Sequence, residues 1–188
     1  MCWDWVAGYD NTGWEKDKSK KTYKGNLSEK IISKCATVDE AINMFLKYND
    51  DSFAYARIMI ADKLGNSAII GWENGKMFIR RNRNKLQAFG FKGDAVKSYF
   101  SENSKNTDVN KLAEALEMAH QEGKYPTQYS NIISISEGKI YLYRKHNYSE
   151  YLEINYLDKL NNSYSSYKMS ELFDRKKSFS DMVLKTNN

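Results

Sequence analysis

The stretch that decides the fold runs from residue 126 to residue 144 and reads Pro126-Thr-Gln-Tyr-Ser-Asn-Ile-Ile-Ser-Ile-Ser-Glu-Gly-Lys-Ile-Tyr-Leu-Tyr-Arg144. It contains two runs of β-branched and aromatic residues, and Glu137-Gly138 separates them. Such runs suit a pleated sheet, whereas a glycine between them lets the chain reverse its direction. The stretch therefore predicts a β-hairpin.

A second group of strands is expected earlier in the chain. Asn74-Gly75 is a strong hairpin signal, because both central residues of a type I′ turn need a positive φ. The turn at residues 62–66 is rich in loop-forming residues. The expected strands are residues 53–61, 67–72 and 76–81, with residues 86–91 as a further candidate.

Helical patterns precede each group of strands. Thr37-Val-Asp-Glu40 reads as a capping box, and an apolar stripe follows it at helical spacing. A second helix is expected after Thr107 or Asp108, with Gly123 as its C-terminal stop. The apolar positions of the two helices are Ala41, Ile42, Phe45, Leu46, Leu112, Ala115, Leu116 and Ala119.

This order of helices and antiparallel strands predicts an α+β fold in one domain spanning residues 1–188. Residues 1–24 are expected to be irregular, because glycine, asparagine and charged residues are frequent there. The tail is rich in Ser, Asn and Lys, so residues 174–188 are expected to be loosely packed.

Composition excludes several classes of function. The net charge of +5 comes from dispersed lysines and acids, and the basic cluster at residues 80–85 lacks any accompanying nucleic-acid motif, so it is interpreted as a solvated turn. No apolar run reaches the ~20 residues of a membrane helix. Cys2 and Cys35 form no zinc-site spacing or disulfide framework. We expect a cytoplasmic protein without metal, cofactor, nucleic acid or membrane.

Several ordered segments resemble the linear amide C–N hydrolases, the choloylglycine hydrolase and penicillin V acylase family. Cys35-Ala-Thr-Val-Asp-Glu-Ala41 is similar to the family's "C-x-T-V-x-E-A" helix start, and Ile60-Ala-Asp-Lys-Leu-Gly-Asn-Ser67 to its "A-D-x-x-G-x-S" hairpin. His120-Gln-Glu-Gly123, Tyr129-Ser-Asn131 and Ser166-Tyr-Lys-Met-Ser-Glu-Leu-Phe173 match later segments in the same order. The resemblance implies antiparallel sheets covered by helices, as in an N-terminal-nucleophile hydrolase, here as an incomplete αββα sandwich.

The resemblance also implies a chemistry. These enzymes use an N-terminal cysteine whose own α-amine accepts the thiol proton, together with a nearby Arg and oxyanion-binding Asn. Cys2 is the only candidate nucleophile, and it would need removal of Met1. No arginine precedes Arg57, and residues 86–91 lack the family's "T-N" pair, with Gln87 as a possible substitute donor. The segment Cys2-Trp-Asp-Trp5 is most similar to an interior part of the family sequence, so the nucleophile segment is expected to be missing.

Two hypotheses follow from these observations. The first is a hydrolase or acyltransferase for linear amide bonds of small N-acyl compounds, truncated or impaired in catalysis. The second is a non-catalytic remnant or interaction subunit of the same fold, whose sheet is completed by self-association or by a partner chain. Asp62 is interpreted as a turn residue, and His120 and His146 as a helix end and a loop.

Overall fold

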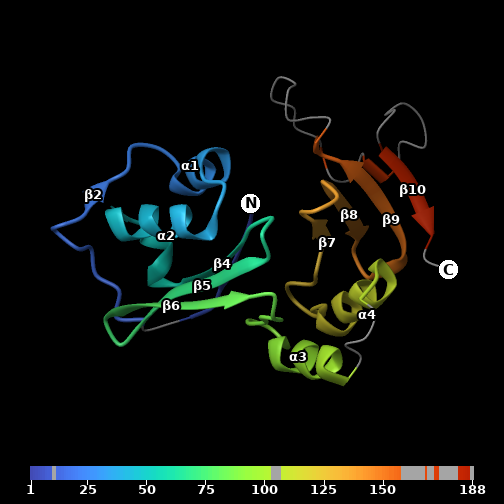
Figure 1. Ribbon diagram of the computed structural model, residues 1–188. Helices are drawn as coiled ribbons and strands as arrows, with labels where there is room; N and C mark the ends of the chain where they lie inside the picture. The colour runs from blue at the N-terminus through green and yellow to red at the C-terminus, as the bar shows by residue number, and fades with distance from the viewer. Residues whose placement is uncertain (10–11, 103–106, 158–167, 169–171, 174–181, 187–188) are drawn as a thin grey trace. The chain divides into compact units, whose positions relative to one another are not determined.

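The computed structural model describes residues 1–9, 12–102, 107–157, 168, 172–173 and 182–186. The expected α+β class is confirmed, since the described chain combines α-helices with mostly antiparallel sheets (Figure 1). The backbone groups into two compact units, Met1–Gln87 and Ala88–Asn188. The expected single domain and the αββα sandwich stay predictions.

A four-stranded antiparallel sheet organises the first unit. Its order is β1-β4-β5-β6, formed by β1 (Cys2–Ala7), β4 (Ala56–Ala61), β5 (Asn66–Glu73) and β6 (Lys76–Arg83). Asn74 and Gly75 have φ values of 52° and 72°, which confirms the predicted turn. Two further short strands, β2 (Lys21–Thr22) and β3 (Tyr48–Asn49), pair in parallel.

Helices α1 (Leu27–Lys34) and α2 (Val38–Lys47) lie over one face of this sheet (Figure 1). The predicted capping box is confirmed, since the Thr37 side chain accepts from the Glu40 amide and the Glu40 carboxylate accepts from the Thr37 amide. The helices and the sheet share one apolar core. Burial of these side chains supplies most of the stability of such short helices. Its fully enclosed members include Ile31, Phe45, Ile58, Ile60 and Ile70.

The second unit begins with α3 (Gly93–Glu102) and α4 (Val109–Ala119) and continues into a sheet. Strands β7 (Tyr129–Ser134), β8 (Lys139–Arg144), β9 (Asn147–Asn155) and β10 (Met182–Thr186) form it in the order β10-β9-β8-β7. Its core joins Ala113 of α4 to three tyrosines of the sheet, Tyr141, Tyr143 and Tyr148.

The opening hairpin is confirmed as β7 and β8. Ser134 lies opposite Lys139, and the Gly138 amide donates to the Ser134 carbonyl over 2.9 Å. Gly138 has φ 70°, and a Cβ there would lie 2.1 Å from Leu157 Cγ. Position 138 therefore needs glycine on both conformational and steric grounds.

Several expectations about the first unit are wrong in detail. Residues 1–24 are not irregular throughout, because β1 pairs along its whole length with β4 and the positive-φ glycines come only after it. Phe53 belongs to a 3₁₀ helix, η1 (Asp51–Ala54), rather than to a strand. The basic residues 80–83 continue β6 instead of forming a turn. Residues 86–91 form no strand, since the backbone turns at Gly90 and Lys92 to enter α3.

Two expectations about the second unit also need correction. Gly123 does not stop α4, because the helix ends at Ala119 and His120 is its C-cap. The tail 174–188 is not wholly loose, since β10 pairs with the edge of β9 that β8 leaves open. The remaining positions of that tail, and most of the 166–173 segment quoted above, lie outside the described residues.

Candidate functional site

Cys2, the only predicted nucleophile, is the first residue of β1 and lies directly opposite Ala61 of β4. Its side chain is half-buried. Burial raises the pKa of the Cys2 thiol, and the N-terminal ammonium and an Ala61 backbone hydrogen bond offset this only in part. The thiol therefore stays protonated at neutral pH, whereas a nucleophile needs the thiolate.

Arg57 is the first arginine of the chain, and the structure does not bring it to Cys2. Since Val6 lies opposite Arg57 and Cys2 opposite Ala61, the two residues are separated by four positions along the sheet, roughly 13 Å. The Arg57 guanidinium forms an ion pair with Glu73 and lies 4.0 Å from the centre of the Tyr9 ring. Its contacts are those of a structural residue.

Gln87, the substitute donor, is also engaged elsewhere. Its side-chain nitrogen donates to the Arg80 carbonyl oxygen over 3.0 Å, which fixes the chain just after β6. The Gln87 amide group is therefore already bound to the backbone.

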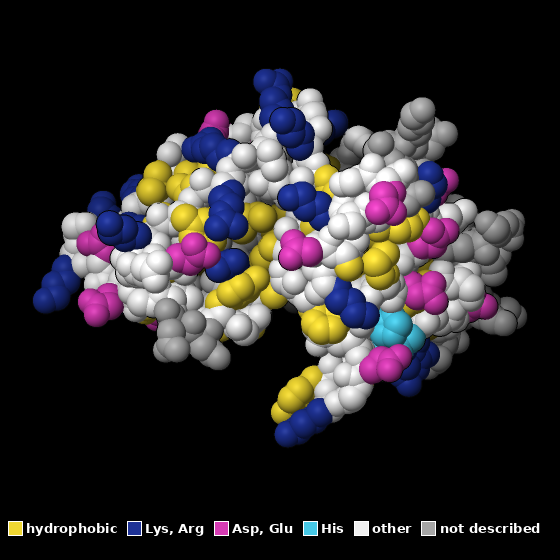
Figure 2. Space-filling view, turned by 90° about the horizontal axis from the view of Figure 1, so that it is seen from below, with side chains coloured by type: hydrophobic (Ala, Val, Ile, Leu, Met, Phe, Trp, Pro, Cys, Tyr) yellow, Lys and Arg dark blue, Asp and Glu magenta, His cyan; other side chains and the backbone are white. Residues whose placement is uncertain are grey.

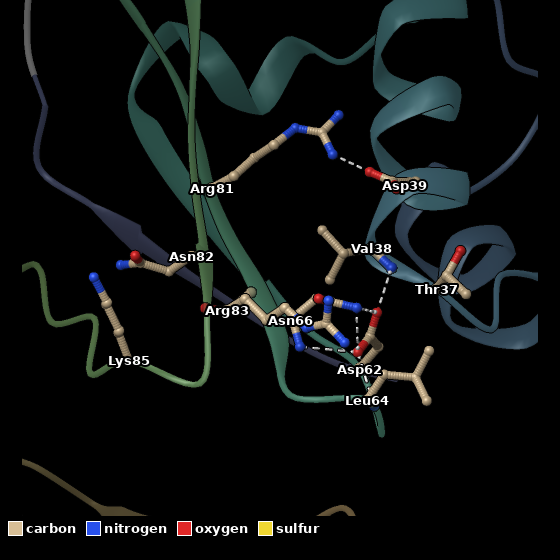
Figure 3. Close-up of a pocket in the computed structure, with 11 residues that line it drawn as sticks. Thr37, Val38, Asp39, Asp62, Leu64, Asn66, Arg81, Asn82, Arg83 and Lys85 are labelled. Carbon is tan, nitrogen blue, oxygen red and sulfur yellow. Dashed lines mark hydrogen bonds and ion pairs between the residues drawn. The ribbon is translucent and has the colours of Figure 1, made fainter.

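A pocket of about 600 Å³ lies elsewhere in the first unit, between the start of α2, the start of β5 and the end of β6 (Figure 3). Leu64 supplies exposed apolar surface next to the buried Val38, and three cationic side chains reach the pocket from the end of β6 and the segment that follows. These are Arg81, Arg83 and Lys85. Its volume falls within the range usual for small-molecule sites.

Asp62 forms one wall of this pocket and ties the helix to the hairpin. Its Oδ2 accepts from the Val38 amide over 3.0 Å, at the first residue of α2. Its Oδ1 accepts from the amides of Leu64 and Asn66 over 2.9 and 3.1 Å, and the Asn66 side chain donates to both oxygens. The interpretation of Asp62 as a turn residue is confirmed, and the contact with α2 adds a second structural role.

The charge state of Asp62 follows from these donors. Burial by itself would raise the pKa of the carboxyl group, but the hydrogen bonds from Val38, Asn66 and Leu64 outweigh burial and hold the pKa below its ordinary value. Asp62 is therefore a carboxylate at neutral pH whose charge is satisfied by amide groups rather than by a cation.

The remaining charges leave the pocket positive. Arg81 points to Asp39 across the pocket and pairs with it (Figure 3). Arg83 and Lys85 pair with no carboxylate in the part of the chain that the structure describes. Two cations beside apolar surface can hold an anionic group that carries an apolar tail.

The structure also assembles a cluster that the sequence did not reveal. His120, Glu122 and His146 come together in the second unit, with the two imidazole ring centres 4.3 Å apart. Figure 2 shows histidine surface beside acidic side chains on this face of the molecule. Along the chain, a loop and the β7–β8 hairpin separate the two histidines. They come into contact because the β8–β9 turn, which contains His146, returns to the end of α4.

No family model and no curated protein matches the chain. Among the described residues, no helix is both long enough and apolar enough to cross a membrane.

Proposed function

We propose that the chain is a non-catalytic binding protein related to the linear amide hydrolases, and that its ligand is a small N-acyl compound with a free carboxylate. The observation that carries this proposal is the pocket beside α2, where Arg83 and Lys85 have no carboxylate partner among the described residues. The carboxylate would pair with these cations, and the acyl group would contact the exposed Leu64 side chain.

Two features argue against hydrolysis by this protein. Burial keeps the Cys2 thiol in its protonated, weakly nucleophilic form. The Arg57 guanidinium is committed to Glu73 and to the Tyr9 ring. Loss of one donor to the oxyanion costs about 10²–10³ in rate, so a site lacking both thiolate and donor is a poor catalyst.

The binding proposal is tested by calorimetric titration with N-octanoylglycine and with its uncharged analogue N-octanoylglycinamide. We expect binding of the acid only, weakened about tenfold or more by Arg83→Gln or Lys85→Gln, because each removes a charge-assisted hydrogen bond. Lys76→Gln is the matched control, since Lys76 is an exposed cation at the other end of β6. Equal binding of acid and amide, or equal effects of all three variants, contradicts the proposal.

An amide hydrolase with Cys2 as nucleophile is the second candidate. It requires removal of Met1, because only then does Cys2 carry the free α-amine that accepts the proton of its own thiol. Its test is intact-mass measurement followed by an amine-release assay. A retained Met1 rules this candidate out, whereas a chain starting at Cys2, with activity that Cys2→Ala abolishes, supports it.

An interaction role remains compatible with the non-catalytic proposal. Strand β1 ends the order β1-β4-β5-β6, so one edge of it has no strand partner among the described residues. Such an edge can accept a strand from a second copy or from another chain. Light scattering coupled to size exclusion tests this, and a monodisperse monomer over a wide concentration range counts against it.

A further inference from the structure

Three potential metal ligands converge at one end of the second unit. His120 is the C-cap of α4, Glu122 follows it in the next loop, and His146 lies in the two-residue turn between β8 and β9. One ligand atom from each residue lies within 4.8 Å of the others, and His120 Nε2 is 3.2 Å from Glu122 Oε1. Two ligands of a tetrahedral zinc ion lie roughly 3.4 Å apart, so only small side-chain movements separate this cluster from a coordinating geometry.

Hydrogen bonds assign the protons of both imidazole rings. His120 Nδ1 contacts the Glu117 carbonyl oxygen, which accepts, so Nδ1 carries the proton of the neutral ring. His146 Nε2 lies 3.1 Å from the Gln121 carbonyl oxygen and therefore carries the proton of its ring. His120 Nε2 and His146 Nδ1 are left with lone pairs, as metal binding requires.

The contact between His120 Nε2 and the Glu122 carboxylate then needs a cation. In the neutral ring both atoms are acceptors, and two acceptors 3.2 Å apart repel each other. A proton on Nε2 or a metal ion between the two atoms removes the repulsion.

The loop that carries the ligands is fixed by its own backbone. The Gln121 amide donates to Thr127 Oγ1 over 2.9 Å, and the Thr127 amide donates back to the Gln121 carbonyl oxygen over 2.9 Å. The same carbonyl oxygen receives the His146 hydrogen bond. This outer shell orients the rings without using the coordinating atoms, as the outer shell of a metal site does.

We propose that His120, Glu122 and His146 bind a divalent transition-metal ion, zinc being the preferred ion. Two imidazoles and one carboxylate form a three-ligand set that borderline ions favour, and it leaves a coordination position open. The Glu122 side chain is 77% exposed, so water or a ligand can reach that position. The ion would join the end of α4 to the β8–β9 turn and would hold two loops together. This site is distinct from the pocket beside α2, because it lies in the second unit.

Zinc titration of the full chain against a chromophoric chelator tests the proposal. Cys2→Ser and Cys35→Ser are present throughout, so that thiolates do not bind the added metal. We expect one zinc ion per chain, and an affinity that falls at least about tenfold in Glu122→Gln and in His146→Gln. Glu102→Gln is the matched control, because Glu102 is an exposed acid at the end of α3 and should leave the affinity unchanged.

Imidazole NMR signals provide a readout that does not depend on affinity. The chain has only two histidines, so His146→Gln assigns both sets of signals. Zinc should shift both sets at neutral pH, because each ring supplies one ligand atom to the ion. Thr127→Val keeps all three ligands and the Thr127 amide bond to Gln121 but removes the Oγ1 acceptor of the Gln121 amide, so it should weaken binding less than loss of a ligand.

Two results would overturn the proposal. One is that the protein with only the two Cys→Ser substitutions and its Glu122→Gln variant have the same zinc affinity, while circular dichroism shows that both are folded. The other is a set of imidazole signals that do not change when zinc is added, which would identify the cluster as a His–Glu contact without a metal.

Discussion

Replacement of Asp62 by asparagine is the sharpest test of how the first unit is held together. The carboxylate accepts hydrogen bonds from four donor groups: the amides of Val38, Leu64 and Asn66, and the Asn66 side chain. An asparagine has one acceptor oxygen, so if that oxygen serves the turn amides, its NH₂ group faces the Val38 amide. Val38 is only 2% exposed, so water cannot replace the lost acceptor.

The expected cost combines a lost charge-assisted hydrogen bond with a buried amide left without an acceptor. Each contributes about 1–3 kcal/mol, and because the two overlap we expect Asp62→Asn to lower the free energy of unfolding by about 2–4 kcal/mol. With a urea dependence of about 2 kcal/mol per molar, the midpoint should fall by about 1–2 M. Tryptophan fluorescence is the right probe, because all four tryptophans, at positions 3, 5, 14 and 72, belong to the first unit.

Asp39→Asn is the control for this experiment. Asp39 lines the same pocket and pairs with Arg81, but its side chain is 70% exposed, so its loss should cost less than about 1 kcal/mol. A cost for Asp62→Asn no larger than that of Asp39→Asn would refute the reasoning.

The pH dependence supplies an independent check. Because the folded-state pKa of Asp62 is lowered, its contribution is fully present above the unfolded value of about 3.9 and is lost as the pH falls through the folded value. The wild type should therefore lose stability in this acid range, and Asp62→Asn should lose less.

Three further predictions concern other parts of the chain. Gly71→Ala should cost about 1–3 kcal/mol in urea unfolding, because its Cβ would lie 2.7 Å from the Phe78 ring; an unchanged midpoint would contradict this packing. The rate of Cys2 alkylation by iodoacetamide should increase with pH, with a midpoint above the ordinary thiol pKa, because burial raises the pKa of Cys2. A rate that has already reached its plateau at pH 7 would show a thiolate instead. Burial and the hydrogen bond to Glu137 raise the pKa of Tyr141 to about 12. Absorbance titration should therefore show a late tyrosinate step that Tyr141→Phe removes. The stability that the neutral phenol contributes should be lost as the pH rises from about 10 through about 12.

Local sequence signals predicted the elements that depend on local chemistry. The Thr37–Glu40 capping box, the Asn74-Gly75 turn and the Asp108 cap all involve residues within a few positions of one another, and each is confirmed. Helices α1 and α3 were not predicted. Of the eight residues of α1, only Leu27 and Ile31 are buried, so tertiary packing rather than a long apolar stripe stabilises it. Strand β10 was missed because only its pairing with β9 defines it.

The sites were harder to predict than the elements. Cys2 was chosen from its place in the sequence, but the pKa of its thiol depends on burial, which the sequence does not show. Asp62 was correctly interpreted as a turn residue, although its bond to Val38 spans 24 positions and could not be predicted. The contact between His120 and His146 depends on how the β8–β9 turn returns to the end of α4. Local patterns contain no information about such distant contacts.

The pairing of β1 with β4 has a consequence for synthesis of the protein. Ala7 pairs with Ala56 and Cys2 with Ala61, so the partner strand leaves the ribosome about fifty residues after β1. At translation rates of about 5–20 residues per second, β1 waits for roughly 3–10 s without its partner. Strand β4 forms its hairpin with β5 in the following seconds, so this sheet is completed by the return of a strand that was synthesised about fifty residues earlier. A ribosome paused before residue 56 should therefore present β1 to chaperones and proteases, and a ribosome paused after β5 has emerged should not.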